Sequence, residues 1–135
     1  MKKMSKYLYY PFISQYYDDN SFLYSIINSC IYKQLTIPSI FNLKNNVDMG
    51  SKEDLIKSVG LNMKNGNNVK KLFENGGILT IVHPIVKNHS FLMIKDNNNK
   101  YILINSWFGP TILIDVEKEI IERVFNIIEG WYFID

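Results

Sequence analysis

The stretch that decides the fold runs from His89 to Trp107 and reads HSFLMIKDNNNKYILINSW. Two apolar runs, Ser90–Ile94 and Tyr101–Ile104, flank the polar cluster Asp96–Asn99. Asp and Asn residues between apolar runs are typical of a β-hairpin, because both tolerate the backbone conformations that tight turns need. The stretch therefore predicts two antiparallel strands.

The register of this hairpin is predicted to bring His89 close to Asn105. If Lys95 faces Lys100 across the turn, His89 falls opposite Ser106. A one-residue adjustment of the turn then pairs His89 directly with Asn105. Cross-strand partners have Cβ atoms about 4.5–5.5 Å apart, so the amide oxygen could accept a hydrogen bond from the imidazole. That bond would fix the tautomer and the direction of the ring.

Further apolar runs surround the hairpin and predict an antiparallel sheet buried on both faces. After Gly76–Gly77 the chain becomes rich in β-branched residues, with short runs at Ile78–Val82 and Thr111–Ile114. The periodicity that begins at Asp115 predicts one more helix, and Trp131–Ile134 predicts a terminal strand.

The amino-terminal third predicts a helix. Between Asn20 and Tyr32 the apolar residues recur at steps of three and four, and capping-competent residues lie at Asp19–Ser21. The middle third, Leu35–Asn75, predicts loops and two short helices, one of which Ser51 would cap. Helix first and sheet last predict an α+β fold, in which the amino-terminal helix packs against the carboxyl-terminal sheet.

Composition limits the classes of function. The 135 residues suit one domain, 1–135, and 47% are hydrophobic, which argues against disorder. Fifteen basic against thirteen acidic residues leave a formal charge of +2, without the basic stripe that nucleic-acid binding requires. We expect no signal peptide, membrane insertion, cofactor or metal site, and no internal disulfide, since Cys30 is the single cysteine. A reducing, cytoplasmic location fits this composition best.

Ser21 is the candidate nucleophile for an imidazole at position 89. A nucleophile at the start of a helix is favoured because the exposed N–H groups and the helix dipole stabilise an anion there. Gln15 lies six residues earlier, where its side-chain amide could stabilise an oxyanion beside the Ser21 backbone N–H. The other histidine, His83, precedes Pro84 at the end of a strand, and a capping or solvent-facing role is predicted for it.

These residues resemble the papain-like cysteine peptidases, in which a glutamine precedes the helix-opening nucleophile by six residues. The segment Gln15–Ser25 is similar to that element, and His89–Ile94 and Tyr101–Trp107 are similar to the family's His strand and Asn-Ser-Trp motif. Chain length and the spacing from His89 to Asn105 are closest to the small C39 peptidases that process bacteriocin leaders. Those normally have aspartate at the second position.

The resemblance implies a papain-like fold and assigns the candidate site. Gln15, Ser21, His89 and Asn105 would be catalytic, with Asn20 and Trp107 on the substrate-binding side and Trp107 covering the His89–Asn105 hydrogen bond. The departure from the family is Ser21, since a serine hydroxyl is far less acidic than a thiol. Cys30 cannot replace it, because nine residues of helix place it on the opposite face and about 13 Å further along.

Three explanations of Ser21 are open: a natural pseudoenzyme, a serine-using variant, or a deliberate Cys-to-Ser replacement. The leading hypothesis is acyl transfer from a peptide or amide substrate to water or to an amine. The alternatives are a catalytically dead module that holds a peptide such as a leader sequence, and an interaction protein that uses an exposed sheet edge. The oligomeric state is open.

Overall fold

The computed structural model describes residues 12–13, 20–47, 51–66, 69–84, 87–96, 99–105 and 111–134. Within these residues the chain forms five α-helices and one six-stranded sheet in which all neighbouring strands are antiparallel. The predicted α+β class and the antiparallel sheet are confirmed.

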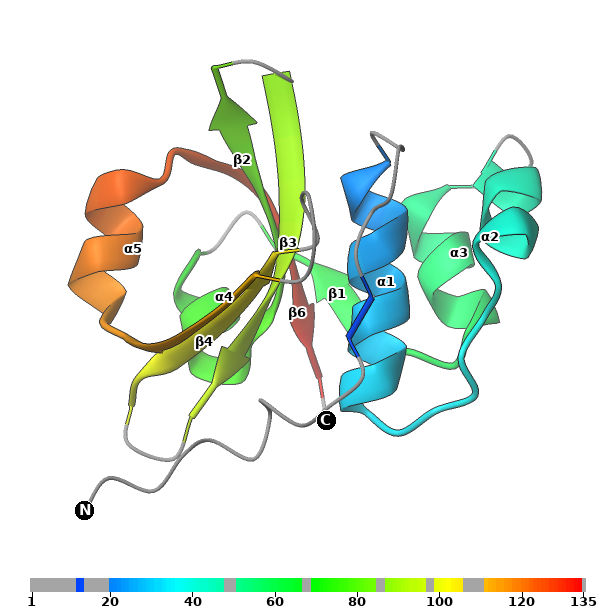
Figure 1. Ribbon diagram of the computed structural model, residues 1–135, viewed down its shortest axis with the longest axis horizontal. Coiled ribbons are helices and arrows are strands. Elements are labelled where there is room, and N and C mark those ends of the chain that lie inside the picture. Colours follow the sequence, from blue (N-terminus) through cyan, green and yellow to red (C-terminus); the bar gives the residue numbers. More distant parts are fainter. Residues whose placement is uncertain are drawn as a thin grey trace.

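The elements follow one another along the chain as Figure 1 shows. Their order and bounds are α1 (Ser21–Tyr32), α2 (Ile40–Val47), α3 (Lys52–Ser58), β1 (Met63–Asn65), α4 (Val69–Asn75), β2 (Gly77–His83), β3 (Lys87–Lys95), β4 (Tyr101–Asn105), β5 (Thr111–Val116), α5 (Lys118–Val124) and β6 (Ile127–Phe133). The strand order in the sheet is β1-β6-β2-β3-β4-β5.

Two layers of helices flank the sheet. Figure 1 shows α1, with α2 and α3 beyond it, on one side and α4 and α5 on the other. One apolar cluster joins residues of α1 such as Ile26 and Cys30 to alternate sheet residues such as Leu92. A second cluster on the opposite face includes Phe91 and Ile121. The alternation of Phe91 and Leu92 between the two clusters explains why the central strands read as continuous apolar runs.

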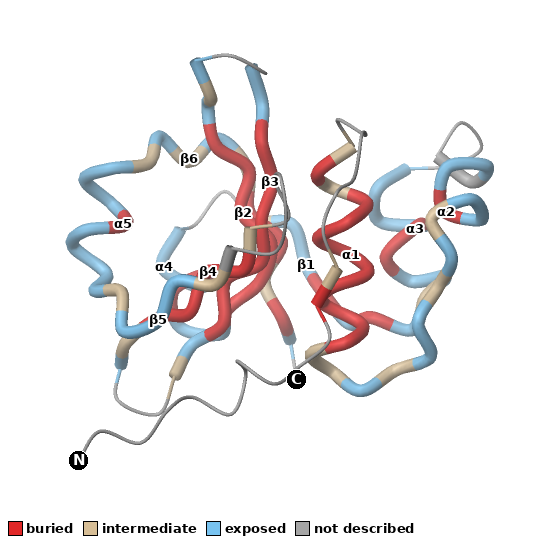
Figure 2. The backbone as a smooth tube through the Cα atoms, viewed as in Figure 1, coloured by how far each residue is buried: buried red, intermediate tan, exposed pale blue. Residues whose placement is uncertain are grey.

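The two helices that flank the sheet differ in burial. Figure 2 shows α1 buried almost throughout and α5 mostly exposed. On α1 every residue from Leu23 to Ile31 is buried, including the polar side chains of Ser25, Asn28 and Ser29. These polar residues must find hydrogen-bond partners inside the protein, because an unpaired buried polar group is costly.

The middle third contains more structure than the sequence predicts. Besides α3, which Ser51 caps by accepting a hydrogen bond from Asp54 N at 3.2 Å, it holds α2, α4 and the short strand β1. The prediction of two helices is therefore wrong. Strand β1 spans only Met63–Asn65 and pairs with the end of β6, so its local sequence is too short to carry a period.

The predicted hairpin register is also wrong by one residue. Lys95 pairs with Tyr101, not with Lys100, and Asp96 N donates to Lys100 O at 2.7 Å. Asn99 has φ 59°, and this left-handed residue lies in a connection that is one residue longer, counted from Lys95 to its partner, than predicted. Continued along the strands, the observed register places Phe91, rather than His89, opposite Asn105.

The helix predicted to begin at Asp115 begins later. Strand β5 continues to Val116, and α5 follows from Lys118 with Glu117 as its N-cap. Asp115 has φ 55°, so the irregularity lies inside the edge strand. Val116 packs against the second cluster as part of β5. Its apolar side chain also fits the helical period that follows, so the pattern alone did not separate strand from helix.

The double glycine before β2 permits close packing of strands. Gly77 has φ 156°, and a Cβ added there would lie 1.9 Å from Trp131 O. Gly76 has φ 77°, and its added Cβ would lie 2.9 Å from Met93 O. Glycine is therefore required where β2 enters between β3 and β6. Among the described helices, none has the length and apolar character needed to cross a membrane.

Candidate active site

The hydrogen bond between His89 and Asn105 joins two neighbouring strands. His89 Nε2 lies 2.7 Å from Asn105 Oδ1. The pairing of β3 with β4 places Asn105 diagonal to His89 on the same face of the sheet, and diagonal neighbours lie about 7–8 Å apart at the backbone. The two long side chains span that separation, so the bond forms without the direct pairing that the sequence predicts.

The partner atom decides the tautomer of His89. An amide oxygen only accepts hydrogen bonds, so Nε2–H of His89 donates to Asn105 Oδ1. In the neutral ring, Nδ1 then carries the lone pair and is the nitrogen that can accept a proton. Nδ1 is buried and makes no hydrogen bond within the described part of the chain. Asn105 therefore orients the ring with its basic nitrogen away from the amide.

The amino-terminal end of α1 lies against the same strand. Ser21 Oγ accepts a hydrogen bond from Ser90 N at 2.9 Å, and Ser90 is the residue next to His89. The described pairing of β3 with β4 ends at Leu92↔Ile104, so the Ser21 hydroxyl occupies a position along β3 that β4 no longer covers. Within the described hydrogen bonds, Ser21 has none to the His89 ring. Its oxygen contacts the backbone of the imidazole's neighbour.

Buried hydroxyl groups surround this contact. Ser90 and Thr80 share a hydrogen bond of 2.7 Å across β3 and β2. On α1, Ser25 Oγ donates to Ser21 O at 2.8 Å, and Ser29 Oγ donates to Ser25 O at 2.7 Å. All five residues are at most 5% exposed. Position 21 is thus held on one side by its own helix and on the other by β3.

A buried asparagine of α1 binds the backbone of Ile13. Asn28, which is 0% exposed, accepts from Ile13 N at 2.8 Å and donates to Ile13 O at 3.2 Å. This pair of bonds imitates the pairing of two strands and fastens Ile13 to the side of α1.

The remaining predicted site residues have different outcomes. Gln15 and Trp107 lie outside the described residues. Asn20 is the half-buried N-cap of α1; its backbone oxygen accepts from Leu23 N and Tyr24 N, at 3.1 and 3.4 Å. The side chain of Asn20 makes no capping hydrogen bond. The hydrogen bonds thus place Ser21 against the backbone of Ser90, the neighbour of His89, and hold the His89 ring against Asn105. Asn20 precedes Ser21 in the chain.

Cys30 lies in the core, as the helical spacing predicts. It is 0% exposed in the cluster that α1 forms with the sheet, and burial raises the pKa of its thiol to about 11. A thiol with this pKa remains protonated at neutral pH, and the thiolate is the nucleophilic form. Cys30 therefore cannot supply the chemistry that position 21 lacks.

Burial also controls the protonation of His89. The side chain is 3% exposed, and burial lowers its pKa from the ordinary value of 6.5. The hydrogen bond with Asn105 raises the pKa against this effect, and the charge of His83 lowers it further. The net shift is downward, so the neutral ring, which can accept a proton, is favoured at neutral pH.

Charged groups next to position 21 neutralise one another. Lys52, the first residue of α3, lies 4.4 Å from the centre of the Phe22 ring and 3.1 Å from both carboxylate oxygens of Glu129. Trp131 Nε1 donates to the same carboxylate. The Lys52–Glu129 pair joins α3 to β6 near the first turn of α1, and it leaves little net charge there.

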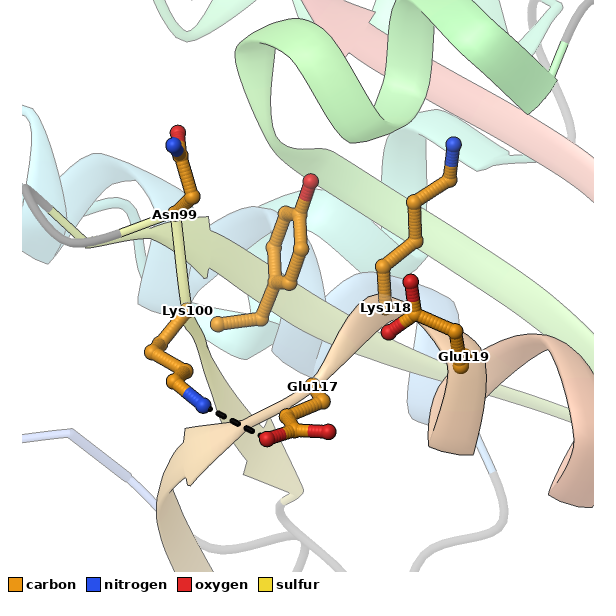
Figure 3. Close-up of a pocket in the computed structure, with 6 residues that line it drawn as sticks. Asn99, Lys100, Glu117, Lys118 and Glu119 are labelled. Atoms are coloured by element: carbon orange, nitrogen blue, oxygen red, sulfur yellow. Dashed lines mark hydrogen bonds and ion pairs between the residues drawn. The ribbon is translucent and has the colours of Figure 1, made fainter.

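The described residues contain no group of three or more His, Cys, Asp or Glu side chains that could hold a metal ion. A cavity of about 470 Å³ lies at the opposite end of β3 and β4 (Figure 3). It is lined by Asn99, Lys100, Tyr101, Glu117, Lys118 and Glu119. None of these is a predicted site residue, and the salt bridge of 2.7 Å between Lys100 and Glu117 is open to solvent. The cavity and the candidate catalytic residues therefore lie at opposite ends of β3 and β4.

Sequence reasoning missed four residues of the site region. Ser90 and Thr80 read only as strand residues, and Asn28 reads only as a polar position on an apolar helix. A polar residue on a helix that is apolar all round is a signal for a buried hydrogen bond, and Asn28 could have been found in this way. His83, for which a solvent-facing role is predicted, lies with its ring centre 5.9 Å from that of His89.

Comparison with known proteins adds no family to this description. No protein-family model matches the chain, and no curated protein or solved structure matches it either. The function is therefore argued from the geometry of Ser21, His89 and Asn105.

Proposed function

We propose that this chain has the active-site framework of a papain-like cysteine peptidase and supports acyl transfer from a peptide or amide substrate. In this proposal position 21 is the nucleophile, His89 the general base and acid, and Asn105 the residue that orients His89. Gln15 and the backbone N–H of position 21 would stabilise the oxyanion, with Asn20 and Trp107 on the substrate side.

One observation carries the proposal. Ser21 Oγ accepts from the backbone N–H of Ser90 at 2.9 Å, and the preceding residue, His89, lies with Nε2 2.7 Å from Asn105 Oδ1. A purely structural histidine needs neither a helix amino terminus beside it nor an amide that selects its tautomer. The combination provides a nucleophile position, a base and an orienting group, which are the parts of a catalytic triad.

The reaction would proceed in two steps. The oxygen or sulfur at position 21 attacks the carbonyl carbon while its proton passes to Nδ1 of His89. The carbon–nitrogen bond then breaks, and the amine leaves with that proton, so that an ester or thioester remains on position 21. Water or a second amine then attacks this acyl group and gives its proton to His89. The bond to position 21 breaks, His89 returns the proton to that oxygen or sulfur, and an acid or a new amide is released.

A second candidate function is a peptide-binding module without catalysis. Ser21 favours it, because the hydroxyl already accepts the Ser90 N–H and has no described hydrogen bond to the imidazole. A hydroxyl used in this way stabilises the contact between α1 and β3. In this case the framework would hold an extended peptide without cleaving it.

The deciding experiment restores a thiol at the nucleophile position. We expect Ser21→Cys to be labelled by a peptide-based thiol electrophile much faster than free cysteine, and to release amine from a peptide library. The parent chain is the first control, because its single thiol, Cys30, is buried with a pKa of about 11. Ser25→Cys is the matched control: it lies one turn along α1 and is 2% exposed.

Three results distinguish the candidates. Fast labelling of Ser21→Cys that disappears in Ser21→Cys/His89→Gln supports the catalytic framework. Labelling no faster than in Ser25→Cys, in a protein that still binds library peptides, supports the binding module. Neither labelling nor peptide binding by a folded Ser21→Cys variant contradicts both proposals.

A further inference from the structure

The second histidine of the chain lies beside the first. His83 is the last residue of β2, two positions beyond Ile81, and Ile81 pairs with His89. His83 is therefore diagonal to His89 on the same face of the sheet, and the ring centres are 5.9 Å apart with planes at 59°. His89 is 3% exposed, whereas His83 is partly exposed at the strand end.

We propose that His83 belongs to the site as a positioning residue, whose imidazole keeps His89 neutral and therefore able to accept a proton. The catalytic consequence rests on the proposed function, but the coupling between the two rings does not. A positive charge on His83 disfavours a second positive charge on His89, because the low dielectric around a buried ring strengthens the repulsion.

The residues that approach His89 from α1, β4 and the segment after α5 carry no charge. The first turn of α1 contains no acidic residue, and β4 contributes the uncharged Asn105. The residue after α5 that reaches this region is aromatic: the Phe125 ring contacts the Phe91 ring, which lies next to the His89 ring. Lys87, on the same strand as His89, is exposed and pairs with His83 in the β2–β3 register.

The direction of the effect agrees with the electrostatics of the site. The charge of His83 lowers the pKa of His89 in addition to the larger effect of burial. The bond to Asn105 acts in the opposite direction, because a ring nitrogen that already donates to an amide is a stronger base at the other nitrogen. His83 and Asn105 would thus adjust the same ring in opposite directions from the two neighbouring strands.

The test is a pH titration of the folded protein by NMR with labelled histidine, which is simple because the chain has two histidines. We expect His83→Gln to raise the midpoint of His89. His83→Lys, which restores a positive charge, should keep that midpoint near the parent value or lower it. Lys95→Gln is the matched control, because it removes an exposed charge at the other end of β3 and should leave the His89 midpoint unchanged.

The parent protein provides a test that does not depend on a variant folding. Its His89 resonances must respond to the titration step of His83 as well as to their own. An unchanged His89 midpoint in His83→Gln, or a His89 curve that is insensitive to His83, would overturn the proposal.

Activity separates this proposal from the function proposed above. In the Ser21→Cys background, His83→Gln should move the acid limb of the labelling-rate profile to higher pH. A shifted NMR midpoint without any labelling would retain the coupled histidines and reject the acyl-transfer function. Labelling whose acid limb does not move in His83→Gln would retain the acyl-transfer function and reject the role of His83.

Discussion

The two ends of β3 differ in burial and in hydrogen bonding. Where the strand begins, His89 and Ser90 are buried and hydrogen-bonded to α1, β2 and β4. Where it ends, Lys95 is exposed, and the turn leads to Lys100, which forms a salt bridge with Glu117 in the lining of an open cavity (Figure 3). Both ends contain short polar contacts, but only the first removes them from water.

This difference decides where specific chemistry can occur. In water an ion pair is screened, and its contribution is small and variable. In a buried site each hydrogen bond is stronger, and a group without a partner is costly, so the arrangement of side chains is well defined. The cavity at the open end therefore has the weaker electrostatics, and the buried imidazole lies at the other end. The following predictions test this contrast, from the largest expected effect to the smallest.

The largest effect should follow removal of the base. In the Ser21→Cys background, His89→Ala should lower the rate of amine release from a peptide substrate by about 10²–10⁴-fold, the usual contribution of a general base. Lys100→Ala, at the other end of the sheet, should leave this rate unchanged in the same assay. Equal losses from both variants would mean that the start of β3 has no special role.

Loss of the Asn28 side chain should destabilise the site end of α1. Asn28→Ala leaves the half-buried N–H and C=O of Ile13 without these partners, so we expect the free energy of unfolding to fall by about 1–3 kcal/mol. Urea denaturation measures it. Asn42→Ala is the control, because Asn42 is an exposed asparagine on α2 and its loss should be nearly neutral. A stable Asn28→Ala variant would contradict the importance of this pair of bonds.

Acid should destabilise the protein through the buried imidazole. The pKa of His89 is lower in the folded state than its ordinary value of 6.5, so the unfolded chain binds the proton first as the pH falls. The stabilisation is complete above about pH 6.5 and is lost as the pH falls from there through the folded pKa. Denaturation at several pH values should show this slope, and it should decrease in His89→Gln. An identical slope in the variant would assign the effect to other groups.

The smallest effect is expected at the open end. The hydrogen bond to Glu117 raises the pKa of Lys100, and Lys100 in turn lowers the pKa of Glu117. Both groups are exposed to solvent, which screens their attraction. Lys100→Gln should therefore leave the melting temperature unchanged within error at physiological salt. A clear decrease would show that this end contributes more to stability than its exposure indicates.

Local pattern was sufficient where one period covers a whole element. The apolar steps between Asn20 and Tyr32 predicted α1, and continuous apolar runs predicted β2, β3 and β4, because each of these elements is long enough to show its own pattern. The pattern failed where it was short or ambiguous. Strand β1 has three residues, and Val116 fits either a helix or a strand.

The amino-acid sequence by itself determined the α+β class, the hairpin that carries His89 and Asn105, and a helix that starts at Ser21. Residue types, periodicity and turn chemistry are local properties, and each can be read without knowing the neighbours. Only the tertiary structure decided the register of the hairpin, the contact of Ser21 with Ser90, and the place of His83 beside His89. The register depends on the left-handed residue Asn99 in the turn, and the other two contacts depend on how α1, β2 and β4 pack against β3. Contacts between segments far apart in the sequence leave no pattern within any one segment.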